Sequence, residues 1–271
     1  MKTLVIRNTK LFFRDRAAVF FSMLSVLIII AMFALFLGQG NWGGDEIRNS
    51  WLMAGVLAVA TITVSLGAVE LMVSDRAGKL MKGLYASPVK RSHITASYVL
   101  SPFIVSVIMT TLTAVAFGVY LIATGGEMLP PLGIVQLLGM ILLASITGTA
   151  LLCLIFSHLK TVASANTVAT IIGTLSGFLM GIYMPMGNLP AAMRYVIMLF
   201  PPAHAAALFR QILMAQPLAD VPLDAALQIE EVLGVVFRVG DFEITPLMSV
   251  AYLAVSAVVF FWLAAVRMRK R

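Results

Sequence analysis

The side chains that could perform catalysis or bind a metal are few and lie far apart in the sequence. The three histidines are His93, His158 and His204, and none belongs to an H-x-x-x-H pair that could hold zinc on one helix face. The single cysteine, Cys153, lies within a long apolar run, so the chain offers no intramolecular disulfide, CxxC pair or cysteine-rich zinc site. We therefore expect neither a metal centre nor redox chemistry.

Two further patterns could belong to enzymes. Gly78-Lys79 is followed by leucine and lacks the G-x-x-x-x-G-K-[ST] pattern that cradles nucleotide phosphates, so we predict that this chain does not hydrolyse nucleotide. Ser176-Gly177 would suit an intramembrane serine protease, which also needs a histidine at the same depth to activate the serine. No span-length segment holds a histidine in its middle, so the protease is a minor alternative.

Composition places the chain in a membrane. Of its 271 residues, 61% are hydrophobic and 11% are charged, and the mean hydropathy is +0.99. Soluble domains are about half apolar and a quarter charged, so these few charges could not cover a soluble surface. The basic residues that give the net charge of +7 are therefore interpreted by their position relative to the bilayer. We expect no nucleic acid as a partner.

Six stretches are long and apolar enough to cross a bilayer, whose core takes about 20 helical residues. These predicted spans are 17–37, 51–73, 94–123, 132–156, 162–183 and 246–266. Six crossings put both termini on one side, and all but four of the 19 Lys and Arg residues then fall on that side. The positive-inside rule makes it the cytoplasm. We predict an all-α polytopic membrane protein with one transmembrane domain over residues 1–271.

One carboxylate lies inside a predicted span. Glu70 falls about one turn from the end of 51–73, where it is costly unless hydrated or paired. Arg7, Lys10 and Arg14 are the nearest candidate partners by topology. An ion-coupled secondary transporter would normally place ionisable groups in span centres. Glu70 is the one candidate for that role, and the ion-driven transporter stays open as an alternative.

Two basic segments on the cytoplasmic side are predicted to be amphipathic. Residues 1–16 would form an interfacial helix with a polar stripe of Thr3, Arg7, Lys10 and Arg14. In the loop 74–93, a short helix ended by Ser87-Pro88 would present an apolar face to the cytosol, for a partner or the lipid headgroups. That face consists of Leu80, Met81, Leu84 and Tyr85. For both segments the alternative is a basic flank that only fixes topology.

Prolines interrupt the chain after the fifth predicted span. Pro185 and Pro190 stop that helix, and Pro201-Pro202 separates two apolar stretches that are each too short to cross. We predict that 184–215 forms outer re-entrant helices with Arg194 and Arg210 near the interface, the alternative being one long broken span. The segment 216–245 faces water, with a short helix at 222–233 and a hairpin pairing 235–239 with 242–244.

Taken in order, these segments resemble the membrane subunit of ABC-2 type transporters. The most specific matches are Asp75 to Arg91, which reads D-R-A-G-K-L-M-K-G-L-Y-A-S-P-V-K-R, and Gly181 to Arg210. The resemblance covers nearly the whole chain. It departs from the family pattern at Ala77, a position that is usually acidic in the family.

The resemblance implies roles for these segments. Residues 1–16 would be the connecting helix, and two membrane subunits, identical or paralogous, would assemble with two copies of an ATPase. The coupling helix would enter a groove on that ATPase through Lys79, Leu80, Met81, Lys82, Leu84, Tyr85, Ser87 and Pro88. The outer gate would include Pro185, Pro190, Pro201, Pro202 and Arg210.

The resemblance also implies ATP-driven export across a prokaryotic inner or plasma membrane. ATP and Mg would be used by the ATPase, and no cofactor would be bound by this chain. The spans carry only scattered polar and aromatic side chains besides Glu70, which suits a hydrophobic or amphipathic cargo such as a drug, an antimicrobial peptide or a lipid-linked molecule. Ordinary packing of helices in lipid would give the same composition.

Overall fold

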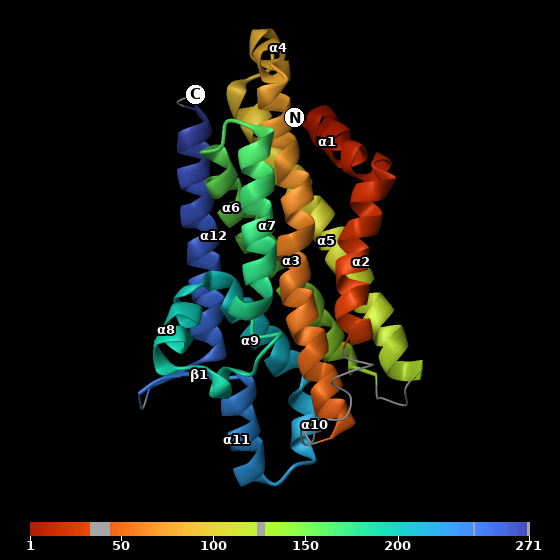
Figure 1. The fold of residues 1–271 in the computed structure, drawn as a ribbon, viewed down its shortest axis with the longest axis vertical. Coiled ribbons are helices and arrows are strands. Elements are labelled where there is room, and N and C mark those ends of the chain that lie inside the picture. Colours follow the sequence, from red (N-terminus) through yellow and green to blue (C-terminus); the bar gives the residue numbers. More distant parts are fainter. Residues whose placement is uncertain (33–43, 124–127, 241, 270–271) are drawn as a thin grey trace.

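The chain folds into a bundle of helices with one small hairpin in a computed structural model that describes residues 1–32, 44–123, 128–240 and 242–269 (Figure 1). The helices at the N-terminal side are α1 Lys2–Arg14, α2 Arg16–Met32, α3 Asp45–Ala77, α4 Leu80–Ala86, α5 Arg91–Ala123, α6 Pro131–Ser157 and α7 Val162–Leu179. They are followed by η2 Met186–Asn188, α8 Ala191–Leu199, α9 Pro201–Leu213, α10 Ala215–Ala219, α11 Leu223–Leu233, β1 Phe237–Val239, β2 Phe242–Ile244 and α12 Pro246–Arg269.

Five of the described helices are long and apolar enough to cross a membrane, namely α3, α5, α6, α7 and α12. They coincide with five of the predicted spans, which confirms an all-α polytopic membrane protein. The predicted span 17–37 corresponds to α2 up to Met32, and its last residues lie outside the described ranges. α7 ends at Leu179, earlier than predicted, because the chain turns at Gly181 with a φ of 66°.

α3 is the centre of the bundle, and its side chains are buried along nearly the whole apolar stretch. Hydroxyl groups join it to its neighbours: Ser65 and Thr149 lie 3.3 Å apart between α3 and α6. Ser106 of α5 donates to the Thr61 carbonyl of α3 and to Ser145 of α6, each over 3.1 Å. Small polar side chains of this kind let membrane helices approach closely while their hydroxyls stay bonded.

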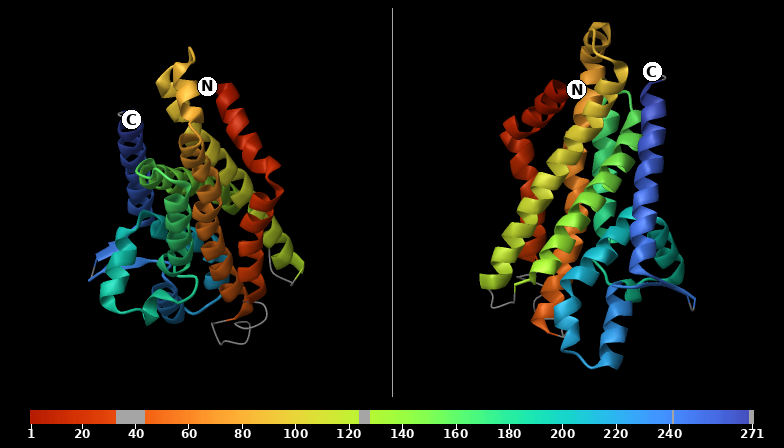
Figure 2. Two further views of the ribbon diagram at one scale, coloured as in Figure 1. Left: turned by 45° about the horizontal axis from the view of Figure 1, so that its top comes forward. Right: turned by 180° about the vertical axis from the view of Figure 1, so that it is seen from behind.

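The two ends of the bundle differ in construction. The N-terminus, α4 and the C-terminal end of α12 lie at one end, and α8, α10 and α11 gather at the other (Figures 1 and 2). α1 is set at an angle to α2, and Asp15 between them caps α2 by accepting a 3.0 Å hydrogen bond from the Ala18 amide. We refer to the end of the bundle that carries α4 as the α4 end and to the opposite end as the α8 end.

The α8 end follows the sequence prediction in its elements. α8 and α9 match the two short apolar stretches and meet at a bend of 94°. Pro201 and Pro202 occupy the first turn of α9, where a missing N–H costs no helical bond. α11 and the antiparallel pair β1–β2, in which Arg238 lies opposite Glu243, confirm the predicted helix and hairpin.

Candidate functional site

The short helix α4 forms the tip of the molecule at the α4 end (Figure 1). α3 stops at Ala77, and Lys79 takes a left-handed conformation with a φ of 61°, which turns the chain into α4. Such a φ is uncommon for a residue with a side chain. At the other end Ser87 Oγ donates a 2.6 Å hydrogen bond to the Leu84 carbonyl and Pro88 follows, so the helix ends where the sequence predicts.

The prediction that the apolar face of this helix is turned outward is wrong for most of that face. Met81 is only 6% exposed, and Leu84 and Tyr85 are half-buried against the main hydrophobic cluster. Packing them within the chain already removes their apolar surface from water, and helical spacing alone could not tell this from a partner's surface. Leu80, 45% exposed, remains outside between exposed Lys79 and Lys82. We call these three residues the α4 surface.

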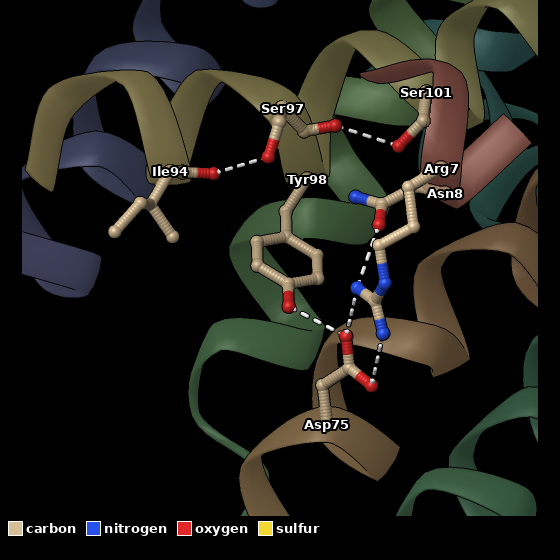
Figure 3. A network of polar contacts seen from close by, with 7 residues as sticks. All are labelled: Arg7, Asn8, Asp75, Ile94, Ser97, Tyr98 and Ser101. Atoms are coloured by element: carbon tan, nitrogen blue, oxygen red, sulfur yellow. Dashed lines mark hydrogen bonds and ion pairs between the residues drawn. The ribbon is translucent and has the colours of Figure 1, made fainter. Parts of the chain in front are cut away.

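An ion pair fixes the C-terminal end of α3 to α1 (Figure 3). The Arg7 guanidinium donates to both carboxylate oxygens of Asp75, over 2.8 and 3.3 Å. The hydroxyl of Tyr98 on α5 donates to the same carboxylate over 2.6 Å, and Arg7 also donates to Asn8 over 3.0 Å. Hydrogen bonding to Asp75 raises the pKa of Arg7. Because Asp75 is buried, this network joins α1, α3 and α5 through charge-assisted bonds.

The predicted pairing of Glu70 with Arg7 is therefore wrong. Asp75 follows Glu70 by five residues along α3, about 7 Å of helix rise, and it is the carboxylate level with Arg7. Lys10 and Arg14 are exposed. No ion pair found among the described residues includes Glu70.

Arg76 connects the same end of α3 to the turn between α6 and α7. Its guanidinium donates to the Leu159 carbonyl over 2.9 Å and to the Ser157 carbonyl over 3.3 Å. Ser157 is the last residue of α6, where helical carbonyls lack partners within the helix, and Leu159 lies in the turn that follows. Asp75 and Arg76 thus hold α1, α5 and α6 against the C-terminal end of α3, directly before α4 begins.

At the α8 end, Arg210 of α9 is fully buried, whereas the sequence suggested a position near the interface. Its guanidinium donates to the carbonyls of Met180 (2.6 Å), Gly181 (3.1 Å) and Gly234 (3.2 Å), and it lies over the Trp51 ring at 5.7 Å. Gly234 has a φ of 69°, and a Cβ there would lie 2.5 Å from Met186 Cγ. Arg210 therefore ties α9 to the ends of α7 and α11 and to α3.

The bend between α8 and α9 is anchored to α12. His204 bonds through Nε2 to the Met198 carbonyl (2.8 Å) and through Nδ1 to Ser249 Oγ (3.0 Å). Tyr252 donates to the Leu199 carbonyl over 2.8 Å. Pro185 and Pro190 precede η2 and α8 in extended conformations that let the chain turn into each helix.

Comparison with known families decides what kind of protein this is. The family model described as ABC-2 family transporter protein matches residues 18–266. The chain belongs to this family. It is a multi-pass permease subunit of an ABC transporter, and membership implies association with an ABC ATPase. A search of curated proteins found no match.

The structure of this ABC-2 permease separates the predicted site residues into two groups. Arg7 of the N-terminal helix and the residues around α4 lie at one end, and the prolines and Arg210 lie at the other. Sequence reasoning missed Asp75 as the partner of Arg7, Tyr98 as a second donor to Asp75, and the bond between His204 and Ser249. A tyrosine near the start of an apolar span was the one available signal for Tyr98.

The contacts of the residues singled out for enzyme chemistry are structural. Ser176 Oγ donates to the Ile172 carbonyl over 2.6 Å, within its own helix. His158 bonds to the Leu154 carbonyl over 2.9 Å, and His204 bridges α8 to α12 as described. In the described ranges, His, Cys, Asp and Glu form no group of three that could hold a metal ion.

Proposed function

We propose that this permease works as half of the membrane part of an ATP-driven exporter, with a second permease subunit and two copies of a separate ATPase that uses ATP and Mg. The observation that carries the proposal is the α4 surface, where an exposed leucine between two lysines lies just beyond the C-terminal end of α3, the buried central helix. An exposed apolar side chain in a basic setting suits a groove on a partner protein.

The contacts around α4 support a mechanical role. Only Gly78 and Lys79 separate α3 from α4 in the sequence, and Met81 packs in the same cluster as Met72 and Val73 of α3, so a displacement of α4 acts directly on α3. The Arg7–Asp75–Tyr98 network and the Arg76 bonds would carry the same displacement to α1, α5 and the end of α6. ATP-driven closure of the two ATPases would thereby move these helices together in each permease.

The proposed topology has six spans, with α2 as the first and α8–α9 as a re-entrant pair on the outer side. Both termini would be cytoplasmic, in a prokaryotic inner or plasma membrane, and α1 would lie on the inner surface as the connecting helix. The 94° bend and the anchoring of both half-helices to α12 support a pair that returns to its own side. The outer gate would then include Pro185, Pro190, Pro201, Pro202 and Arg210.

The exposed face of α7 supports a second permease subunit. Little of this span is buried, and its exposed side chains include four polar ones, Asn166, Thr167, Thr170 and Thr174. An amide that faces lipid is unfavourable because nothing there replaces its hydrogen bonds to water. Contact of this face with a second permease subunit would supply hydrogen-bond partners for the Asn166 amide. The path for a hydrophobic or amphipathic cargo would then run between the two subunits.

Purification of the tagged chain from its native membranes tests the proposal. We expect an ABC ATPase to copurify at about equal stoichiometry and transport in vesicles to require ATP. Transport that proceeds without ATP and follows an ion gradient would favour the ion-coupled alternative instead.

A further inference from the structure

A cavity of about 250 Å³ lies beside α3 near the α4 end, between the junction of α1 and α2 and the start of α7. Its apolar wall includes Phe12, Leu71 and Ala165, and its polar groups include Asp15, Glu70 and Asn166. Both ionisable side chains that line it are acids. The cavity thus combines an apolar wall with negative charge at the inner end of the predicted spans.

Glu70 is the ionisable side chain of this cavity that lacks a partner among the described residues. The Asp15 carboxylate already accepts a hydrogen bond from the Ala18 amide, whereas neither a hydrogen bond nor an ion pair is found for Glu70. Of the three candidate partners, Arg7 is held by Asp75, and Lys10 and Arg14 are exposed. A half-buried carboxylate at membrane depth is unfavourable without a counter-charge.

We propose that this cavity binds the cationic group of an amphipathic substrate, with Glu70 as its counter-charge. The proposal rests on the transport function proposed above and narrows its cargo to amphiphiles that carry a positive charge. Phe12, Leu71 and Ala165 line the wall that would cover the apolar part of the substrate. An anion of the same shape would meet Glu70 and Asp15 and be repelled.

The test uses two probes of nearly equal size and opposite charge, tetraphenylphosphonium and tetraphenylborate. Their binding is measured on the purified full-length chain in detergent, by equilibrium dialysis, without the ATPase. We expect the cation to bind at least about tenfold more tightly than the anion, and Glu70→Gln to remove that preference. Glu70→Asp keeps the charge and should retain most of the preference for the cation. Asp224→Asn, which removes an exposed carboxylate on α11, is the matched control and should change nothing.

The outcomes separate this proposal from the proposed function. Unchanged cation binding in Glu70→Gln, with a gel-filtration profile like that of the wild type, would overturn the cation site. Full competition by phosphatidylethanolamine would also overturn it, because the cavity would then hold a lipid headgroup. Failure of the ATPase to copurify would contradict the exporter and leave the binding result intact. In the complete transporter we expect tetraphenylphosphonium to stimulate ATP hydrolysis and Glu70→Gln to abolish that stimulation.

Discussion

Arg7 and Asp75 are 68 residues apart in the sequence and form an ion pair of 2.8 Å between α1 and α3. Because Tyr98 donates to the same carboxylate, one buried aspartate holds three helices at the end of the molecule where α4 begins. The pair places α1 against the bundle, where Phe12 packs among Val64, Ala68, Val105 and Met109. We therefore regard α1 as part of the bundle as well as a surface helix.

We predict that Asp75→Asn destabilises the protein, because Arg7 keeps its charge and loses its ionised acceptor. The expected cost is about 1–3 kcal/mol, seen as a melting temperature several degrees lower in detergent. A double-mutant cycle with Arg7→Ala should show coupling of about 1 kcal/mol or more. Lys10→Ala, which changes an exposed residue on the same helix, is the control. Additive effects of the two substitutions would contradict the ion pair.

A second prediction concerns Arg210. Arg210→Met removes the donor from the carbonyls of Met180, Gly181 and Gly234, and we expect a loss of about 3 kcal/mol or more. Arg194→Met on α8 is the matched control, with an expected change within about 0.5 kcal/mol. Thermal unfolding followed by tryptophan fluorescence would measure both. Equal stability of the two variants would mean that Arg210 does not hold the α8 end together.

Much of this fold follows from sequence pattern, and the exceptions have a common cause. The spans at α3, α5, α6 and α12 were predictable because apolar runs of that length have one stable form in lipid. The end of α4 before Ser87-Pro88 was predictable from proline. The partner of Arg7 was not, since Glu70 and Asp75 lie on one helix and only the height at which α1 meets it decides between them.

The same limit applies to burial. Helical spacing placed the four large apolar residues of α4 on one face, but it could not show that Met81 packs inward while Leu80 stays outside. Arg210 gave no sign in the sequence of its burial, because its acceptors are backbone carbonyls from two distant segments. Side chain to backbone contacts leave no pattern of residue types to recognise.

The proposed orientation predicts opposite labelling of the two ends. In a Cys153→Ala background, Gln228→Cys on α11 should react with a membrane-impermeant maleimide added to intact cells. Lys82→Cys on α4 should react only after permeabilisation. Both positions are exposed, so a difference in labelling reports the side of the membrane. The reverse result would overturn the orientation and, with it, the assignment of α4 to the cytoplasm.

The second permease subunit predicts cross-linking from α7. In the same cysteine-free background, Thr170→Cys should give covalent dimers with a short bifunctional maleimide in membranes, if the partner is a second copy. Val258→Cys on α12, an exposed residue on an apolar face, should not. Dimers from Val258→Cys alone would place the subunit contact on α12 and contradict the role given to the polar face of α7.

The central claim is that an ATPase drives this permease through the α4 surface, and Leu80→Asp tests it most directly. The change puts a charge at the one large apolar side chain of α4 that is exposed, without disturbing Met81, which packs inward. Leu223→Asp, at a leucine of α11 that is more exposed than Leu80 (74% against 45%), is the control. The measurement is the amount of ATPase that copurifies with each tagged variant from membranes holding equal amounts of permease. We predict loss of the ATPase with Leu80→Asp and wild-type recovery with Leu223→Asp. Wild-type recovery with both would contradict the claim.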